Sequence, residues 1–192
     1  ARDGPRSAAR AATGVHGVAR VARGGTLGEG VDVGACGWIG EAGERGDGPR
    51  IGPHCVIHGR TRVGRDNVFH GQSVIGGDPQ DKKYAGERVA LEIGDGNAIR
   101  EFVTINRGTG DGGGVTRIGN RNWILAYTHI AHDCNVGSDC VISNNATLAG
   151  VFTGGDHVIL RGLTGVHTDG LSGAHAYIGM DAVVEGRGTA VL

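Results

Sequence analysis

The sequence predicts an all-β protein in which six-residue repeats wind into a parallel β-helix of about nine triangular coils. The first observation is a period of six: apolar residues occupy 23 of the 26 positions of a six-residue lattice, where about six matches are expected by chance. The second is glycine, at 39 of 192 residues against a usual share of ~7%. The third is that this period matches neither the 3.6-residue repeat of a helix nor the alternation of a strand.

The lattice positions follow the chain in three runs. They are Val15, Val21, Leu27, Val33, Ile39, Arg45, Ile51, Ile57, Val63, Phe69 and Ile75, then Ile93, Ile99 and Ile105, then Ile118, Ile124, Ile130, Val136, Ile142, Leu148, Gly154, Leu160, Val166, Ser172, Ile178 and Val184. The three breaks are Arg45, Gly154 and Ser172. A glycine follows 13 of the 26 positions, where a sharp corner needs a backbone conformation that glycine reaches without strain. Three such units close one coil of 18 residues, and stacked coils pair in parallel at ~4.8 Å.

The elements follow from this lattice in chain order. Residues 1–14 are expected to form a loose N-terminal tail, because they are rich in Arg and Ala and lack the apolar core of a signal peptide. A transit peptide is the alternative for this segment. Residues 15–192 are expected to form the hexapeptide-repeat domain. Two interruptions, 76–92 and 107–116, are expected to leave the coil as loops, and such excursions are where functional residues tend to lie.

The composition excludes several classes of protein. A formal net charge of −1 gives no basic surface for nucleic acid. No apolar run approaches the ~20 residues of a membrane helix, so the sequence predicts a soluble protein without membrane insertion.

Cys55, Cys134 and Cys140 each follow a lattice aliphatic by four residues, where core packing is favoured over metal binding. The segment "GTGDGG" (108–113) fits a dinucleotide-binding pattern but opens no helix of a βαβ unit, so it is interpreted as a loop.

The segment "THIAHDC" (128–134) places two histidines three apart, with Asp133 directly after the second. An 18-residue coil puts His132 beneath Gly150 and Asp133 beneath Val151, with ~4.8 Å between coils. The imidazole is then within reach of a backbone N–H that no side chain obstructs. Acyl transfer needs this pair, since the base removes a proton from the attacking hydroxyl and the N–H stabilises the oxyanion. Asp133 is expected to orient the ring.

Two alternatives to catalysis remain for His129 and His132. They could be zinc ligands, but a catalytic zinc takes three protein ligands. No pair among the nine histidines has the five-residue spacing that carbonic anhydrases on this scaffold use. They could also be solvated surface histidines. The sequence favours catalysis without a metal.

Four segments together resemble one family. They are "IGGDPQDKKYAGE" (75–87), "IREFVTINRGT" (99–109), "AYTHIAHDC" (126–134) and "NNATLAG" (144–150). They are similar to segments of the UDP-N-acetylglucosamine 3-O-acyltransferases, the enzymes that catalyse the first step of lipid A synthesis. The similarity extends from about residue 15 to 185 without a shift in register. The resemblance implies a left-handed β-helix and a homotrimer in the bacterial cytoplasm, with active sites between subunits. It also implies transfer of an (R)-3-hydroxyacyl chain from acyl carrier protein to the 3-hydroxyl of UDP-N-acetylglucosamine, without metal or cofactor.

The resemblance implies roles for individual residues. His132 is implied to be the general base, Asp133 its orienting partner and the Gly150 N–H the oxyanion donor. Other positions are implied to contact substrate: Gln80, Asp81, Lys83, His129, Gly162, His167 and Thr168. Of these, Gln80, Asp81 and Lys83 are implied to reach the sugar nucleotide across the interface between subunits.

Met180, in "AYIGMDAVV", falls where this family gauges its acyl groove. A glycine at this position leaves a long channel, whereas a methionine blocks the end of the channel. The resemblance therefore implies a medium-length acyl chain.

The chain departs from the family at three places. Val151 stands where histidine is usual, and Thr168 replaces an amide that helps to hold substrate. The sequence stops at Leu192, before the family's helical C-terminal domain, which supplies uridine contacts and much of the carrier-protein surface.

Two other functions are therefore weighed against the acyltransferase. One is a non-catalytic trimeric scaffold, which Val151 and the short end favour and the retained "HIAHDC" opposes. The other is an acetyl-CoA-dependent acetyltransferase, which would be indifferent to acyl carrier protein. A trimer is also expected, because in a closed threefold ring the two excursions can contact neighbouring subunits.

Overall fold

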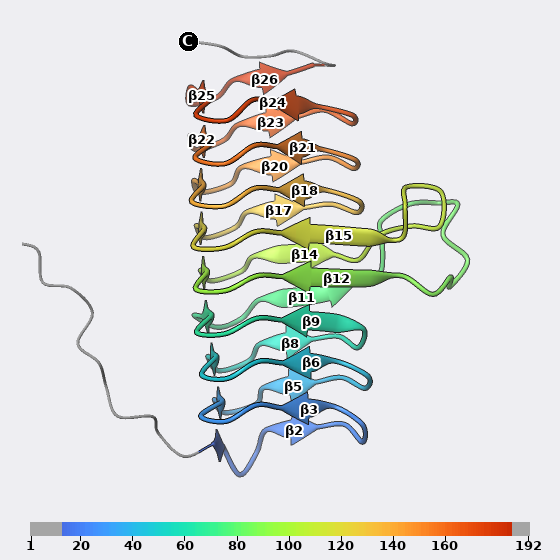
Figure 1. Cartoon of the computed structure of the whole chain (residues 1–192), viewed down its shortest axis with the longest axis vertical. Helices are drawn as coiled ribbons and strands as arrows, with labels where there is room; N and C mark the ends of the chain where they lie inside the picture. The colour runs from blue at the N-terminus through green and yellow to red at the C-terminus, as the bar shows by residue number, and fades with distance from the viewer. Residues whose placement is uncertain (1–12, 186–192) are drawn as a thin grey trace, which may run out of the picture.

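The computed structural model describes residues 13–185, which form an all-β solenoid. Twenty-six short strands wind into a left-handed parallel β-helix with three faces (Figure 1). The predicted fold class is confirmed, and so is the number of coils, since the three sheets contain nine, nine and eight strands. Strand β1 begins at Gly14, while residues 1–12 of the expected tail lie outside the described residues. Within residues 13–185, no helix is long and apolar enough to cross a lipid bilayer.

Each sheet takes every third strand of the chain, and its strands run parallel. Sheet A contains β1 (Gly14–Val15), β4 (Asp32–Val33), β7 (Arg50–Ile51), β10 (Val68–Phe69), β13 (Ala98–Ile99), β16 (Trp123–Ile124), β19 (Val141–Ile142), β22 (Ile159–Leu160) and β25 (Tyr177–Ile178). Sheet B contains β2 (Arg20–Val21), β5 (Trp38–Ile39), β8 (Val56–Ile57), β11 (Val74–Gly77), β14 (Thr104–Asn106), β17 (His129–Ile130), β20 (Thr147–Leu148), β23 (Gly165–Val166) and β26 (Val183–Val184). Sheet C contains β3 (Thr26–Leu27), β6 (Glu44–Arg45), β9 (Thr61–Val63), β12 (Ala90–Ile93), β15 (Val115–Ile118), β18 (Asn135–Val136), β21 (Thr153–Gly154) and β24 (Leu171–Ser172).

Every lattice position lies in a strand, and the strand register shows the length of each coil. Val33 pairs with Ile51, as a coil of 18 residues requires. Phe69 pairs with Ile99 and Ile99 with Ile124, so the two interrupted coils contain 30 and 25 residues. The strands run further into the interruptions than the lattice predicts. The loops that leave the coil are therefore shorter than expected: the first excursion is 78–89 and the second excursion is 107–114.

The glycines that follow lattice positions are needed for a different reason from the one predicted. The left-handed corner residue is the third after the lattice position, as at Tyr127 (φ 63°), and it is usually not glycine. All eight strands of sheet C are followed directly by glycine, and none of these eight has a positive φ. A Cβ at Gly119 would lie 2.5 Å from the carbonyl oxygen of Gly137. Glycine is required there because the next coil approaches too closely for any side chain.

The core is one cluster of buried, mostly aliphatic side chains that runs through the coils. Cys55, Cys134 and Cys140 lie in this cluster, which confirms their predicted packing role. Burial raises the pKa of Cys134 to about 12. The break at Gly154 is compensated, because a Cβ there would lie 2.8 Å from the ring of Phe152, which fills the space.

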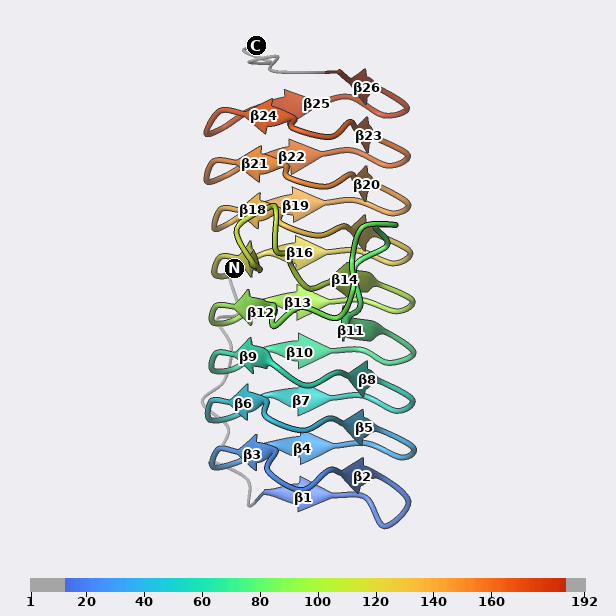
Figure 2. The same ribbon diagram turned by 90° about the vertical axis from the view of Figure 1, so that its right-hand side faces the viewer.

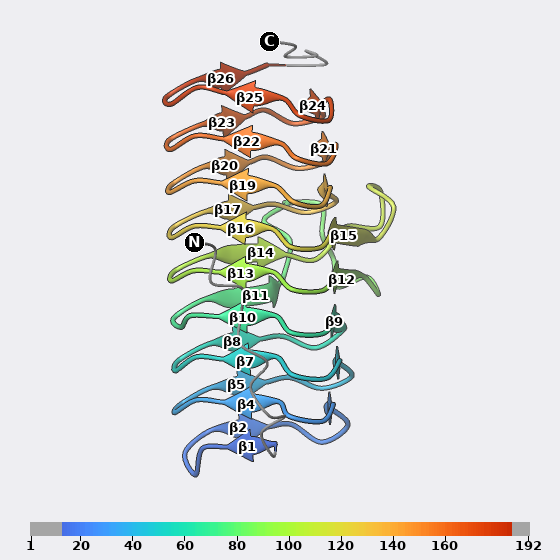
Figure 3. The same cartoon turned by 60° about the vertical axis from the view of Figure 1, so that its left-hand side comes forward.

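Two corners of the prism matter for function. The A–B corner joins each sheet A strand to the next sheet B strand, and the B–C corner joins sheet B to sheet C. Both excursions leave at the B–C corner and lie side by side (Figures 1 and 2). Figure 3 shows the A–B corners along one edge of the prism and the excursions on the opposite side.

The roots of the two excursions are tied together. The Arg107 guanidinium donates to the carbonyl oxygen of Gly76 at 2.9 Å and pairs with the Asp78 carboxylate. The Asn106 side chain donates to the Asp78 carbonyl oxygen at 2.8 Å. Further out, a Cβ at Gly110 would lie 3.5 Å from the Glu87 side chain, so the two excursions also touch. The second excursion is thus anchored both at its start and along its length.

Candidate active site

His132 and Asp133 lie on the B–C corner directly after β17. The chain turns at Asp133, whose φ is 58°, and this turn brings its carboxylate back to its neighbour. The Nδ1 atom of His132 lies 2.9 Å from Oδ2 of Asp133. The Asp133 side chain is fully buried, whereas the His132 side chain keeps 18% of its surface exposed. The carboxylate therefore accepts the Nδ1 proton and leaves Nε2 of His132 free to act as a base.

Gly150 lies directly on the His132 ring, as the 18-residue stacking predicts. His129 and Ile130 pair with Thr147 and Leu148, which sets this register. A Cβ at Gly150 would lie 2.5 Å from Cε1 of His132. Among the described residues, no acceptor pairs with the Gly150 N–H. A candidate base thus lies against a glycine whose N–H has no acceptor among the described residues, and acyl transfer needs such a base and such a donor.

Val151, one residue further on, has a φ of 65°, a conformation that β-branched residues rarely adopt. Its N–H donates to the His132 carbonyl oxygen at 3.0 Å. This bond links the backbone of the base to the coil above it. Val151, for which the sequence resemblance implies a histidine, is therefore bonded through its backbone to the candidate base.

Two threonines hold Asp133, and the sequence analysis did not identify either of them. The Thr109 backbone N–H lies 2.9 Å and 3.0 Å from the two carboxylate oxygens, and its hydroxyl lies 2.6 Å from Oδ2. Thr116 accepts the Asp133 backbone N–H at 2.8 Å. Thr116 stands one coil beneath Cys134 and could have been found by the stacking argument. Thr109 lies in the second excursion, where no register applies.

His129 projects outward from β17 and rests on a neighbour in the coil below. Its Nδ1 lies 2.7 Å from Oγ1 of its register partner Thr104. Burial lowers the pKa of His129 below its usual value, and the nearby His132 lowers it further. His129 is thus held neutral and suited to hydrogen bonding with a substrate rather than to carrying charge. Among residues 13–185, no three His, Cys, Asp or Glu side chains are placed to hold a metal ion.

The first excursion carries three of the predicted substrate contacts. Gln80 and Lys83 are exposed, and Asp81 is partly buried. The Asp81 carboxylate accepts the Lys83 backbone N–H at 2.9 Å, which forms a local turn. The excursion that carries them projects from the side of the prism (Figure 1).

The remaining predicted residues divide between two corners. His167 and Thr168 are exposed on the B–C corner, one coil above Ala149 and Gly150. Gly162 and Met180 lie on the A–B corner instead, where a Cβ at Gly162 would lie 3.6 Å from the terminal methyl of Met180. Within one chain, the candidate base and the backbone donor therefore lie together on the B–C corner. Met180, the residue predicted to limit the acyl chain, lies on the A–B corner.

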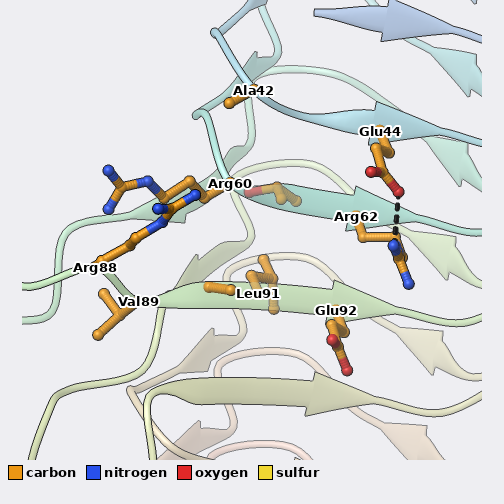
Figure 4. A pocket seen from close by; sticks show the side chains of 10 residues that line it. Ala42, Glu44, Arg60, Arg62, Arg88, Val89, Leu91 and Glu92 are labelled. Carbon is orange, nitrogen blue, oxygen red and sulfur yellow. Dashed lines mark hydrogen bonds and ion pairs between the residues drawn. The ribbon is translucent and has the colours of Figure 1, made fainter.

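A hollow beside the first excursion lies between the B–C corner and sheet C, in coils that precede the coil of the candidate base. It is lined by Ala42, Glu44, Arg60, Thr61, Arg62, Arg88, Val89, Ala90, Leu91 and Glu92 (Figure 4). Arg60 and Arg88 extend in the same direction at one end, and Arg62 pairs with Glu44 at 2.8 Å. The lining has no histidine or cysteine, so it lacks a base of the kind found at His132.

Comparisons with known proteins agree with this geometry. The family profile described as "Bacterial transferase hexapeptide (six repeats)" matches residues 116–150, which include His132 and Gly150. A relative from Xylella fastidiosa (strain Temecula1 / ATCC 700964), named acyl-[acyl-carrier-protein]--UDP-N-acetylglucosamine O-acyltransferase, is 58% identical over 172 residues, 90% of this chain and 65% of the relative. A relative of the same name from Stenotrophomonas maltophilia (strain R551-3) is 63% identical over 123 residues, 64% of this chain and 47% of the relative.

Solved structures give the same result. The UDP-N-acetylglucosamine acyltransferase from Bacteroides fragilis 9343 superposes with a TM-score of 0.87 at 32% identity, over 89% of this chain and 67% of that one. The enzyme of the same name from Campylobacter jejuni gives a TM-score of 0.62 at 33% identity, over 89% of this chain and 71% of that one. The chain spans about half to two thirds of the length of these curated relatives.

Proposed function

Because the chain belongs to the UDP-N-acetylglucosamine O-acyltransferase family, we propose that it transfers an (R)-3-hydroxyacyl chain from acyl carrier protein to the 3-hydroxyl of UDP-N-acetylglucosamine. The proposed reaction is the first step of lipid A synthesis and takes place in the bacterial cytoplasm. The observation that carries the proposal is the His132–Asp133 pair beneath Gly150. In this arrangement His132 would supply the base and the Gly150 N–H the oxyanion donor.

The proposed chemistry follows from these three residues. Nε2 of His132 takes the proton from the sugar 3-hydroxyl as the oxygen attacks the thioester carbonyl. The Gly150 N–H donates to the oxyanion of the tetrahedral intermediate. Collapse of the intermediate breaks the carbon–sulfur bond, and the thiolate takes the proton from His132. Asp133 stabilises the charged imidazole between these two proton transfers.

We propose that the other predicted residues bind the substrates, and that the complete site lies between copies of the chain. His167 and Thr168 lie on the same corner as the base, and His129 lies in β17, the strand that leads to that corner. Gly162 and Met180 lie on the A–B corner, so they would serve the base of a neighbouring copy. The same holds for the exposed contacts of the first excursion, Gln80, Asp81 and Lys83. No metal or cofactor takes part in the proposed reaction.

The outer surfaces of the prism support a homotrimer. Sheet C carries charged side chains, which pair as Glu44 with Arg62 and as Glu92 with Arg117. Sheet C also exposes one large apolar side chain among the described residues, Leu171. Sheets A and B and their shared corner expose many more, among them Trp38, Val74, Phe102, Trp123, Tyr127, Leu163, Tyr177 and Val183. Phe102 and Tyr127 stack at 4.8 Å on that corner. Apolar exposure on two faces and a charged third face fit a threefold ring of parallel prisms.

Tyr127→Glu combined with Leu163→Glu is expected to convert the trimer into monomers, because it places charge on the apolar A–B corner. Sedimentation velocity would measure the change, and turnover should fall with it although His132 is untouched. Arg117→Glu on sheet C is the control and should leave the trimer intact. A parent protein that sediments as a monomer would contradict the shared site.

The reaction and its acyl-chain length are tested together with donors of graded length. The parent is expected to use a medium-length 3-hydroxyacyl carrier protein. Met180→Gly should shift the kcat/KM ratio by about tenfold or more toward a fourteen-carbon donor, because the side chain beside Gly162 is removed. Met180→Leu keeps the bulk and should keep the parent's preference. A parent that prefers the fourteen-carbon donor would contradict the role of Met180.

The same assay separates the two other functions. Turnover with acetyl-CoA and indifference to acyl carrier protein would indicate an acetyltransferase. No turnover with any donor would indicate the non-catalytic scaffold, which the valine at position 151 in place of a histidine favours.

A further inference from the structure

The carboxylate of Asp133 is enclosed by the second excursion, although the two lie more than 20 residues apart in the chain. Thr109 supplies its backbone N–H at 2.9 Å and 3.0 Å to the two oxygens and its hydroxyl at 2.6 Å to Oδ2. The His132 ring approaches Oδ2 from the other side at 2.9 Å. A fully buried carboxylate with these donors has one orientation, because rotation would leave buried polar atoms without partners.

The glycines of the "GTGDGG" segment make this enclosure possible. A Cβ at Gly108 would lie 2.6 Å from Oδ1 of Asp133, and a Cβ at Gly112 would overlap Oδ2. The Gly112 N–H donates to the Thr109 hydroxyl oxygen at 3.1 Å, which orients the hydroxyl proton toward the carboxylate. The segment that resembles a dinucleotide loop in sequence thus forms a cradle for a carboxylate of the same chain.

The cradle is itself held in place at both ends. The Gly114 N–H donates to the Thr109 carbonyl oxygen at 2.8 Å, which closes the loop. At its start, Arg107 is fixed by the carbonyl oxygen of Gly76 and by Asp78. Thr109 therefore stands in a loop that is closed by its own backbone and fixed at its start by Arg107.

We propose that Thr109 is a positioning residue for the transfer reaction, acting through Asp133 to keep the His132 ring in its Nδ1–H tautomer with Nε2 facing the substrate. This inference rests on the proposed function, since it assigns a role within the same site. Thr109 is buried and touches the carboxylate, so it acts without contacting substrate. Loss of its hydroxyl bond lets the carboxylate and the imidazole rotate away from the geometry that the reaction needs.

Thr109→Val tests the proposal, because valine keeps the shape and the backbone N–H and removes the two hydrogen bonds of the hydroxyl, the one it donates to Asp133 and the one it accepts from Gly112. We expect kcat to fall about 10- to 100-fold while KM for both substrates changes less than about twofold. Thr109→Ser restores the hydroxyl and should return kcat to within about threefold of the parent. In ¹⁵N NMR of the intact protein, the His132 signals should show the Nδ1–H tautomer in the parent and in Thr109→Ser, and a mixture of tautomers in Thr109→Val.

Thr61→Val is the matched control. Thr61 is equally buried, and among the described residues its hydroxyl has no partner, so its kcat and the His132 signals should match the parent. Gly112→Ala is a second variant that displaces Asp133 without altering Thr109, and it should reproduce the loss of kcat. Unchanged kcat and tautomer in Thr109→Val, or equal losses in the valine and serine variants, would overturn the proposal. A parent without turnover would refute the proposed function alone, because the NMR signals still test the positioning role.

Discussion

Replacing His132 with alanine is expected to lower kcat about 10²- to 10⁴-fold, the range for loss of a general base. The Gly150 donor remains in this variant, so residual turnover above the uncatalysed rate should survive. KM for the sugar nucleotide should change little, because the imidazole acts on the reacting hydroxyl rather than on the rest of the substrate. Initial rates at saturating donor concentration, with the sugar nucleotide varied, would separate the two parameters.

The controls for this variant are two other histidines. His157 stacks on His175 at 4.6 Å, away from the B–C corner, and His157→Ala should keep the activity of the parent. His129→Ala should mainly raise KM, because His129 lies beside the base and is held by Thr104. A larger loss of kcat at His129 than at His132 would assign the base to His129.

The stacking of His132 and Gly150 could be predicted because a solenoid converts sequence separation into position. Each lattice residue needs an apolar side chain, so the period is visible in the sequence and the coil length follows from it. The same arithmetic places Met180 above Gly162. It also reaches Thr116 and Thr104, since both lie in strands that keep the register.

The cradle around Asp133 could not be predicted in this way. Thr109 belongs to an excursion, and a chain that leaves the lattice carries no register from which its contacts could be derived. The pattern "GTGDGG" indicated only a loop, because the partner of its donors is a carboxylate more than 20 residues away. The reason for the glycines after sheet C was also missed, since the closeness of the next coil is a property of the stack rather than of any one repeat.

The three lattice breaks show the same limit. The sequence places Phe152 two residues before Gly154, and only the structure shows that its ring fills the space. Ser172 is buried, and within the described chain its hydroxyl has no partner. Arg45 is the largest departure, because its side chain is only 4% exposed and its three nitrogens have no partner among residues 13–185.

Arg45→Leu is therefore expected to raise the free energy of unfolding by about 3 kcal/mol near neutral pH. Burial lowers the pKa of the Arg45 guanidinium to about 10, well below its usual value. Between the folded and the unfolded pKa the unfolded chain binds more protons than the folded one, so stability rises with pH only above about 10. Below that pH the folded protein bears the whole destabilisation, and the substitution removes it.

Urea unfolding at one fixed chain concentration would measure this effect, since dissociation of an oligomer also contributes to stability. The difference between variant and parent should stay constant from about pH 6 to 9 and shrink above about pH 10, where the parent's guanidinium loses its proton. Arg62→Leu is the matched control, because that side chain is exposed on the same sheet and pairs with Glu44 at 2.8 Å. It should change stability by less than about 1 kcal/mol.

Leucine suits the position because the register places Arg45 between Leu27 and Val63 in one inward-facing column. An apolar side chain there makes that column continuous through the lower coils and leaves no charge to desolvate. A variant less stable than the parent would show that the guanidinium finds a partner inside the solenoid in solution. In that case the break at Arg45 would be a stabilising feature of this chain rather than a defect in its lattice.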